Sequence, residues 1–430
     1  MNIAIADRIS YKKQRDTYVA IFAAIITFLT YSSVYAFRKP FTAAIYSDVH
    51  PIAGLAYKDL LVICQVLGYM LSKFYGIRFI AELKQMGRAR LILILVAIAW
   101  FSLLFFAIVP TPYNIIFLFI NGFPLGIIWG VVFSFVEGRK ATDFIGAALS
   151  VSFIFSSGFV KSVGKWLMVY AHITEWWMPF LTGLVFVVPL LLFLWLLEKI
   201  PPPSPADREV RSVRLPLNKE ERKQFFRRFS TGLILLNTIY VLLTVFRDIR
   251  DNFAADMWKE MGYGNEPSVF TTTEIPITII VLILISSMIW IRNNHKAFVI
   301  IHLLIMAGFC IAGISSWLFI HQQLGPFAWM TLVGLGLYIG YIPFNCTIFD
   351  RMIATFKQAG NVGFLMYMAD SFGYLGSVGV ILMKTTFSFS LHWTVVYSTG
   401  VMYLSVIGIA GTLAALQYFN KKYKTTIHTV

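Results

Sequence analysis

The chain has 430 residues, of which 58% are hydrophobic and only 13% are charged. Soluble domains carry about 25% charged residues, and apolar runs of about 18 residues or more recur along the whole length, so a soluble globular protein is excluded. The net charge of +15 would suggest a nucleic-acid partner in a soluble protein. Here most of the basic residues fall in short loops on one side of the predicted membrane segments, which accounts for them without nucleic acid.

Twelve apolar segments are predicted to cross the membrane as helices. Each run is continuous and not alternating, and lipid admits only helices or closed barrels. In chain order the segments are residues 17–46, 57–80, 90–110, 113–136, 142–168, 174–198, 229–254, 268–291, 297–320, 326–350, 360–384 and 392–419. The predicted fold class is an all-α membrane protein with twelve transmembrane helices.

A Pro-rich and then charged stretch, residues 199–228, separates the sixth segment from the seventh. It is predicted to be a cytoplasmic linker between an N-terminal six-helix half, residues 1–198, and a C-terminal six-helix half, residues 229–430. Lys and Arg concentrate at the N-terminus, in alternate loops and in this linker. This bias predicts that both termini are cytoplasmic.

The two halves show a sequence repeat. Tyr31 and Arg38 in the first segment correspond to Tyr240 and Arg247 in the seventh, at a shift of 209 residues. Two six-helix halves in parallel repeat describe the major facilitator architecture, in which the solute binds near the bilayer midplane between the halves.

Charged residues inside these segments are candidates for a solute site, because a charge at the centre of a membrane helix costs about 2.5–3.5 kcal/mol on insertion scales. The excess of cations over carboxylates predicts an anionic solute, although a structural ion pair is the alternative role for any of them. The cations are Arg38, Lys39, Lys73, Lys161, Arg247 and Arg250, and the carboxylates are Asp248, Asp251, Glu274 and Asp370.

The spacing of polar residues predicts that three helices face one cavity. Residues three, four, seven or eight positions apart share a helix face. Such stripes, each ending in a cation, are Tyr31, Tyr35 and Arg38; Gln65, Tyr69 and Lys73; and Tyr240, Thr244 and Arg247. Arg offers a planar fork for phosphate or carboxylate, and Lys offers a point charge.

The carboxylates leave alternatives open. Lys39 is predicted to form a bridge between the halves with either Asp251 or Glu274. Asp370 either neutralises Lys73 or Lys161, or carries a proton, as intramembrane acids do in many transporters. Lys161 is a candidate for the same gating or coupling role.

The first segment resembles a known family. Residues 31–44, YSSVYAFRKPFTAA, are similar to the first-helix motif of the organophosphate:phosphate antiporters. The stretch from Tyr69 to Phe74 resembles their second-helix pattern, and Arg247 occupies the place of their second substrate arginine. The resemblance implies substrate roles for Arg38, Lys73 and Arg247, and a bridge between the halves that involves Lys39. The chain also resembles a group of bacterial membrane proteins with no assigned function, which implies the bacterial inner membrane.

Secondary transport of a small anion, with a phosphorylated metabolite or organic anion exchanged for phosphate as the candidate solute, is the leading functional hypothesis. Proton-coupled symport of a carboxylate or other solute is the second, and a transporter-like membrane sensor or scaffold is the third. No nucleophile–base pair, metal-ligand cluster or phosphate-binding glycine loop is found in the sequence, so no enzyme activity, cofactor or metal is predicted. The expected partners are the anion and the lipid bilayer, and the chain is expected to be monomeric.

Overall fold

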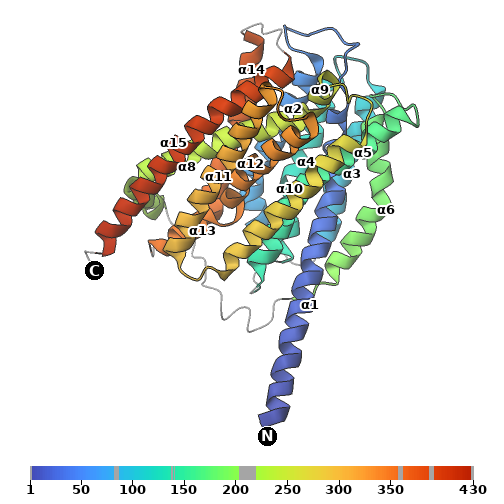
Figure 1. Cartoon of the computed structure of the whole chain (residues 1–430). Coiled ribbons are helices and arrows are strands. Elements are labelled where there is room, and N and C mark those ends of the chain that lie inside the picture. The colour runs from blue at the N-terminus through green and yellow to red at the C-terminus, as the bar shows by residue number, and fades with distance from the viewer. Residues whose placement is uncertain are drawn as a thin grey trace.

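The computed structural model describes residues 2–81, 87–136, 139, 141–202, 219–356, 362–386 and 392–427. These residues form fourteen α-helices and two short 3-10 helices (η1 and η2), with one isolated β-bridge between Ile52 and Leu55. The helices run roughly side by side in one bundle, and α1 extends beyond it at the N-terminus (Figure 1).

The helices fall into two sets on either side of the predicted linker, of which residues 203–218 lie outside the described part. The N-terminal set comprises α1 (Asn2–Tyr35), η1 (Pro40–Ala43), α2 (Tyr57–Ala81), α3 (Arg88–Ile108), α4 (Ile115–Ser134), α5 (Thr142–Val169) and α6 (Met178–Glu198). The C-terminal set comprises α8 (Lys219–Asn252), α9 (Ala254–Glu260), α10 (Ser268–Ser287), η2 (Met288–Trp290), α11 (Asn294–Ile320), α12 (Pro326–Cys346), α13 (Ile348–Thr355), α14 (Val362–Thr386) and α15 (Trp393–Ile427).

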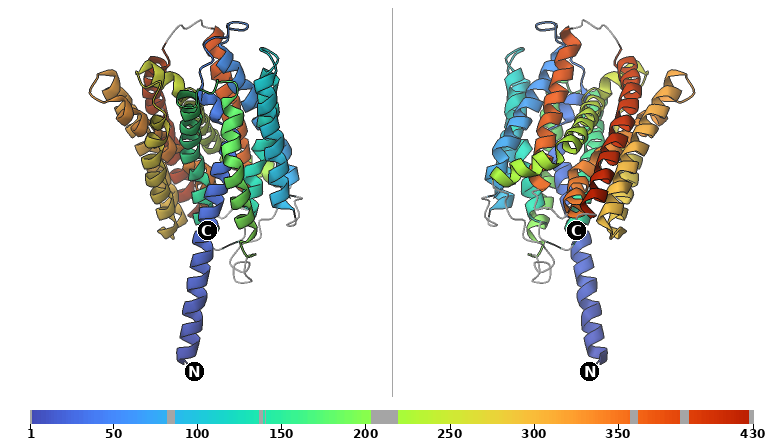
Figure 2. Two further views of the ribbon diagram at one scale, coloured as in Figure 1. Left: turned by 90° about the vertical axis from the view of Figure 1, so that its right-hand side faces the viewer. Right: turned by 90° about the vertical axis from the view of Figure 1, so that its left-hand side faces the viewer.

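Contacts between the two sets are concentrated on a few helices. α5 packs against α10 and α12, and α2 packs against α14. Both chain termini lie at one end of the bundle (Figure 2). The opposite end, which we call the outer end, carries the loop between η1 and α2 from one set and α9 from the other (Figure 1).

Ten of the described helices are long and apolar enough to span a membrane, so this is an integral membrane protein. The remaining two predicted spans fall on α2 and α14. α2 carries Lys58, Asp59 and Lys73, and the apolar stretch of α14 is limited to Met368–Met383. The total of twelve transmembrane helices therefore stays a prediction.

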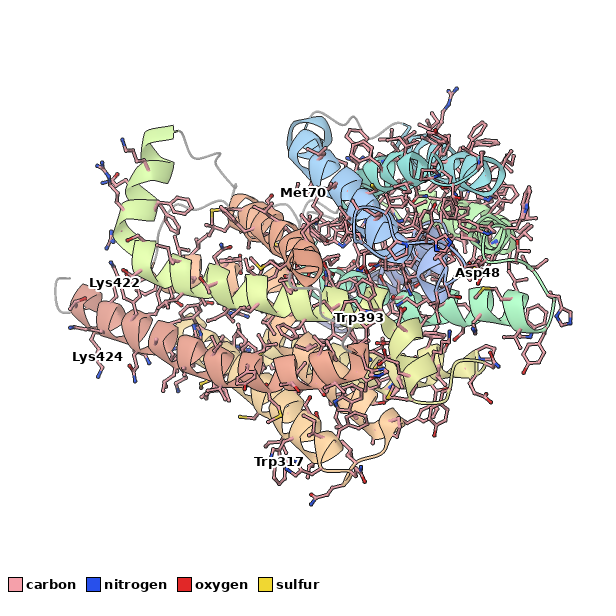
Figure 3. The ribbon with its side chains drawn as sticks, turned by 90° about the horizontal axis from the view of Figure 1, so that it is seen from above. Asp48, Met70, Trp317, Trp393, Lys422 and Lys424 are labelled. Atoms are coloured by element: carbon pink, nitrogen blue, oxygen red, sulfur yellow. The ribbon has the colours of Figure 1, made fainter. Side chains whose placement is uncertain are left out.

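The outer surface of the bundle suits lipid. Large apolar side chains are exposed around its rim, and Trp317 on α11, which is 44% exposed, is one of them (Figure 3). The interior of the bundle holds both aromatic and charged side chains, and the candidate site lies among them.

The first predicted span differs from the structure. The sequence predicts one helix through residue 46, but α1 ends at Tyr35, and the backbone N–H groups of Arg38 and Lys39 both donate to the carbonyl of Tyr35 at 3.0 Å. Pro40 explains the early end, because proline has no N–H to donate and its ring clashes with the carbonyl four residues earlier, that of Ala36. Arg38 and Lys39 therefore lie in a turn between α1 and η1.

Glycines allow α2 and α4 to pack with their backbones in contact. A Cβ atom on Gly122 would come within 2.2 Å of the carbonyl oxygen of Gln65. We therefore expect Gly122→Ala to lower the free energy of unfolding by about 1–3 kcal/mol, the usual cost of overpacking. Thermal unfolding in detergent measures the effect. Gly379→Ala on α14 is the control, because a Cβ atom there meets nothing within 4 Å, and equal shifts in the two variants would contradict the expectation.

Candidate functional site

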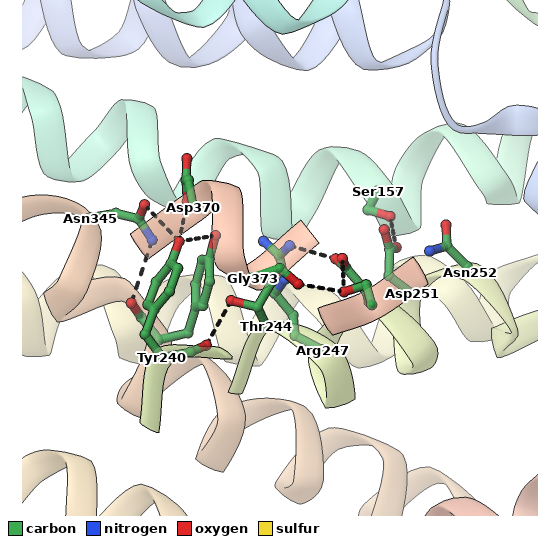
Figure 4. Close-up of polar contacts among 12 residues, drawn as sticks. Ser157, Tyr240, Thr244, Arg247, Asp251, Asn252, Asn345, Asp370 and Gly373 are labelled. Carbon is green, nitrogen blue, oxygen red and sulfur yellow. Dashed lines mark hydrogen bonds and ion pairs between the residues drawn. The ribbon is translucent and has the colours of Figure 1, made fainter. Parts of the chain in front are cut away.

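Polar side chains form a buried row along α8. Tyr240, Thr244, Arg247 and Asp251 follow one another along the helix, with Tyr240 at one end of the row and Asp251 near the outer end (Figure 4). The Thr244 hydroxyl donates to the carbonyl of Tyr240 at 2.8 Å. The predicted stripe on the seventh span is therefore present as one line of side chains, all facing other helices.

Arg38 lies against aromatic rings and not against a carboxylate. Its guanidinium is 3.7 Å from the centre of the Tyr69 ring and 5.7 Å from that of Tyr35. The residue is only 8% exposed. Within the described part of the chain the guanidinium makes no ion pair, and its Nε atom has no hydrogen-bond partner. A buried arginine with open donor positions is a ready site for an anion.

Side chains from α2 and α4 hold the turn that carries Arg38. Gln65 donates to the backbone carbonyl of Arg38 at 2.7 Å and to the side-chain oxygen of Asn121 at 2.8 Å. The Asn121 amide donates to the carbonyls of Phe37 at 2.8 Å and Ala99 at 2.9 Å. The position of Arg38 is therefore fixed by hydrogen bonds from neighbouring helices, because α1 itself has already ended.

Arg247 has a carboxylate partner, unlike Arg38, its counterpart in the repeat. Its guanidinium lies 2.5 Å from Oδ1 of Asp248, and Ser377 donates to Oδ2 of the same carboxylate at 2.8 Å. The guanidinium also stacks at 4.2 Å from the centre of the Tyr341 ring. A chain of contacts links this arginine to Arg38: Tyr341 stacks on Tyr240, which bonds to Asp370, and Asp370 pairs with Lys73 beside the Tyr69 ring that Arg38 covers.

Lys73 and Asp370 form an ion pair that joins α2 to α14. The Tyr240 hydroxyl donates to the other oxygen of Asp370, so both carboxylate oxygens have partners. Lys73 also lies 5.3 Å from the centre of the Tyr69 ring, the same ring that Arg38 covers. Of the two cations considered as partners of Asp370, Lys73 is therefore the one in contact.

Asp251 is the centre of a second set of contacts, nearer the outer end. We call Lys39, Lys161 and Asp251 the outer ion cluster. Lys39 Nζ lies 2.5 Å from Oδ2 of Asp251, and Lys161 Nζ lies 2.5 Å from Oδ1. The Ser157 hydroxyl also bonds to Asp251 (Figure 4), and Lys39 donates to the Asn252 side chain at 2.7 Å. One carboxylate of α8 thus holds two lysines from the N-terminal set.

Glu274 has a different partner from the one considered in the sequence. It pairs with Arg250 at 2.6 Å, and Arg250 also donates to the carbonyl of Met330 at 3.0 Å. The alternative in which Lys39 bridges to Glu274 is therefore wrong for this conformation. The physical reason is that Arg250, near the end of α8, holds one oxygen of Glu274, while Lys39 is held by Asp251 and Asn252.

Sequence reasoning missed several neighbours of the site. Tyr374 follows Asp370 by one helical turn, and its ring centre lies 5.2 Å from Lys73 Nζ. Tyr341 stacks on Tyr240 with ring centres 5.2 Å apart. The sequence could have indicated Tyr374, because it lies four residues after the charged residue Asp370 on α14. It could not have indicated Tyr341, because that residue lies in an apolar segment of α12 with no nearby charge. Tyr31 and Tyr35, which the sequence analysis does name, have ring centres 5.5 Å apart.

The charges predicted for the site do not balance. The six predicted cations and four predicted carboxylates are all described, and 6 − 4 leaves two positive charges among these ten residues; the buried residues Lys58 and Asp59 of α2 lie outside this set. Arg38 accounts for one, because it has no carboxylate partner in the described residues. The outer ion cluster accounts for the other, because two lysines share Asp251. No group of three or more His, Cys, Asp or Glu side chains that could hold a metal occurs among the described residues.

Three solved structures have a similar fold. The D-xylose–proton symporter aligns with a TM-score of 0.58 and 16% identity, over 93% of this chain and 96% of that chain. The human organic anion transporter MFSD10 (TETRAN) aligns with a TM-score of 0.51 and 14% identity, over 94% and 99%. A mutant of the nucleoside transporter NupG aligns with a TM-score of 0.60 and 12% identity, over 92% and 99%. At these identities the similarity shows the fold alone, which is that of the major facilitator transporters.

The sequence comparisons add the family. No curated protein sequence matches the chain, and the resemblance to the organophosphate:phosphate antiporters stays a prediction. The sequence model described as "Family of unknown function (DUF5690)" matches residues 40–422, which include every candidate site residue except Tyr31, Tyr35, Arg38 and Lys39. Since this match covers most of the chain, the protein belongs to the DUF5690 family.

Proposed function

We propose that this protein is a secondary transporter of a small anion, which binds in the interior between Arg38 and Arg247. One observation carries the proposal: Arg38 is buried, stacked on Tyr69 and without a carboxylate partner in the described residues. A buried charge normally has a partner, because leaving it uncompensated is costly. An anionic solute is the partner that would complete this site.

The unpaired positive charge of Arg38 supports an anionic solute, and the second surplus charge belongs to the outer ion cluster. A phosphate ester or inorganic phosphate is anionic near neutral pH and offers oxygens for two-point contact with arginine. The surrounding tyrosine hydroxyls would add neutral donors. A phosphorylated metabolite exchanged for phosphate across a bacterial inner membrane is therefore the solute class that we propose, in line with the resemblance of residues 31–44.

The contacts between the two sets of helices support alternating access. Lys58 on α2 pairs with Asp256 on α9 at 2.6 Å. Lys73 follows Lys58 on the same helix, and the rise of about 1.5 Å per residue places it about 22 Å further along. Between these levels lies the outer ion cluster. Ion pairs thus join the sets from the outer end down to the central site, and their breaking and re-forming would let the sets rock about a bound solute.

Purified protein in proteoliposomes tests the proposal. We expect radiolabelled inorganic phosphate to exchange across the vesicle membrane, and phosphate or glycerol 3-phosphate to raise the melting temperature of the protein, because a ligand of the native state stabilises it. Arg38→Ala should weaken binding about 10- to 100-fold, the loss expected for charge-assisted hydrogen bonds worth about 1.5–3 kcal/mol. Arg247→Ala should also reduce exchange.

Arg292→Ala is the matched control, because this arginine is exposed at the end of α10 and η2, away from the site. Exchange that is unchanged in both Arg38→Ala and Arg247→Ala would overturn the proposal. Binding without any measurable flux would instead favour a sensor that has kept a transporter fold.

A further inference from the structure

Asp370 differs from the other buried carboxylates in what it holds. Asp248 binds Arg247 on its own helix, and Glu274 binds Arg250 within the C-terminal set. Asp370 instead binds Lys73, a candidate solute residue of the N-terminal set. The protein therefore supplies its own anion to Lys73, while Arg38, which covers the same Tyr69 ring, has none in the described residues.

A solute anion that contacts both Arg38 and Lys73 competes with Asp370 for the charge of Lys73. The displaced carboxylate would then be a buried anion that has lost its counter-ion, a state that proteins avoid by taking up a proton. Asp370 is only 8% exposed. Binding of the anion and protonation of Asp370 are therefore linked, because each favours the other.

The surroundings of Asp370 can accommodate the protonated acid. The groups that face it are Lys73 and Tyr69 from α2, Tyr240 from α8, Tyr341 from α12 and Tyr374 from its own helix. Tyr240 donates to the carboxylate in the present structure, and its hydroxyl also lies 3.4 Å from the side-chain oxygen of Asn345.

When Asp370 takes a proton from water, its new O–H can donate to the Tyr240 hydroxyl. The Tyr240 hydrogen can then turn toward Asn345 (Figure 4). The hydrogen-bond chain from Asp370 through Tyr240 to Asn345 reverses its direction, and the hydroxyl groups in it keep a partner.

We propose that Asp370 is the proton-coupling residue of this transporter, so that one proton enters with each solute anion that displaces Asp370 from Lys73. This inference rests on the proposed anion transport and adds the coupling ion to it.

Proteoliposomes with a pH-sensitive dye inside test the coupling, with radiolabelled inorganic phosphate as the probe and the membrane potential held at zero. In the unaltered protein, an inward gradient of one pH unit should drive phosphate accumulation up to about tenfold, because one pH unit corresponds to a tenfold concentration ratio for one proton. In Asp370→Asn, accumulation should stop responding to the gradient, while exchange of internal for external phosphate at equal pH continues. The protonation of phosphate in solution is the same in both experiments. A difference in gradient response between the unaltered protein and Asp370→Asn is therefore due to the protein.

Asp370→Glu keeps a titratable group and should keep the response, which guards against a folding defect in Asp370→Asn. Glu260→Gln is the control variant, because Glu260 caps the start of α15 at the outer end, where it accepts from the Trp393 and Thr394 backbone. A gradient response that survives in Asp370→Asn, or exchange in the unaltered protein with no gradient response, would overturn the coupling and leave anion transport standing. An unaltered protein that neither binds nor exchanges phosphate would overturn the proposed function and the coupling with it.

Discussion

Replacing Asp251 by Asn is expected to separate the two sets of helices at the outer end. The substitution leaves Lys39 and Lys161 buried with no carboxylate between them, and both are at most 4% exposed. Removing one partner of a buried ion pair costs about 3–5 kcal/mol, because an uncompensated charge remains. Without the carboxylate of α8, neither lysine of the N-terminal set is tied by its charge to the C-terminal set, so the population should shift toward a form that is open at this end.

Spin labels provide the measurement. Asp48→Cys on the N-terminal set and Asn265→Cys after α9 are both exposed positions at the outer end. The distance distribution between the two labels should lengthen in Asp251→Asn. Lys161→Met is the matched control, because it leaves one lysine and one carboxylate, Lys39 and Asp251, at 2.5 Å. A larger change in Lys161→Met than in Asp251→Asn would contradict the account of the cluster.

Replacing Asn121 by Leu is expected to damage both stability and anion binding, although the residue is not a candidate contact of the solute. Asn121 is completely buried, and its side chain makes hydrogen bonds to Gln65 and to the carbonyls of Phe37 and Ala99. Each buried group left without a partner costs about 1–3 kcal/mol. The free energy of unfolding should fall by about 3 kcal/mol or more, and the turn that carries Arg38 should lose its attachment to α4.

Thermal unfolding and phosphate binding on the same samples check this expectation. Asn237→Leu on α8 is the control, because the side-chain oxygen of Asn237 has no hydrogen-bond partner in the described residues. That variant should be neutral or slightly stabilising. Wild-type phosphate affinity in a destabilised Asn121→Leu protein would show that Arg38 is positioned by something other than these hydrogen bonds.

The sequence identifies the charged residues of the interior, but it does not determine which of them form ion pairs with each other. Periodicity places Lys73 and Tyr69 on one helix face and identifies Asp370 as a charge that needs a partner. It does not choose between Asp251 and Glu274 for Lys39, because both belong to helices of the C-terminal set and the choice depends on how α8 and α10 are rotated. That rotation is fixed by packing, including Gly158 on α5, where a Cβ atom would come within 2.4 Å of the Phe270 carbonyl oxygen.

The local structure around Arg38 could not be predicted from the sequence, for a different reason. The spacing of Tyr31, Tyr35 and Arg38 predicts one continuous helix face, yet the helix has ended before Arg38. Pro40 indicates a break nearby but does not give its position. Asn121 lies in a glycine-containing apolar segment that reads as a packing surface. The Asn121 amide donates to backbone carbonyls of distant segments. Such contacts cannot be predicted from the pattern of side chains along the sequence.

The composite surface at the outer end has a practical consequence. It combines the loop that contains Asp48 from one set with α9 from the other, joined by Lys58 and Asp256. An antibody fragment whose epitope includes Asp48 and Asn265 would recognise the two only at the spacing that they have while this end is shut. Such a fragment would act both as a reporter of that conformation and as a reagent that holds this end of the bundle shut.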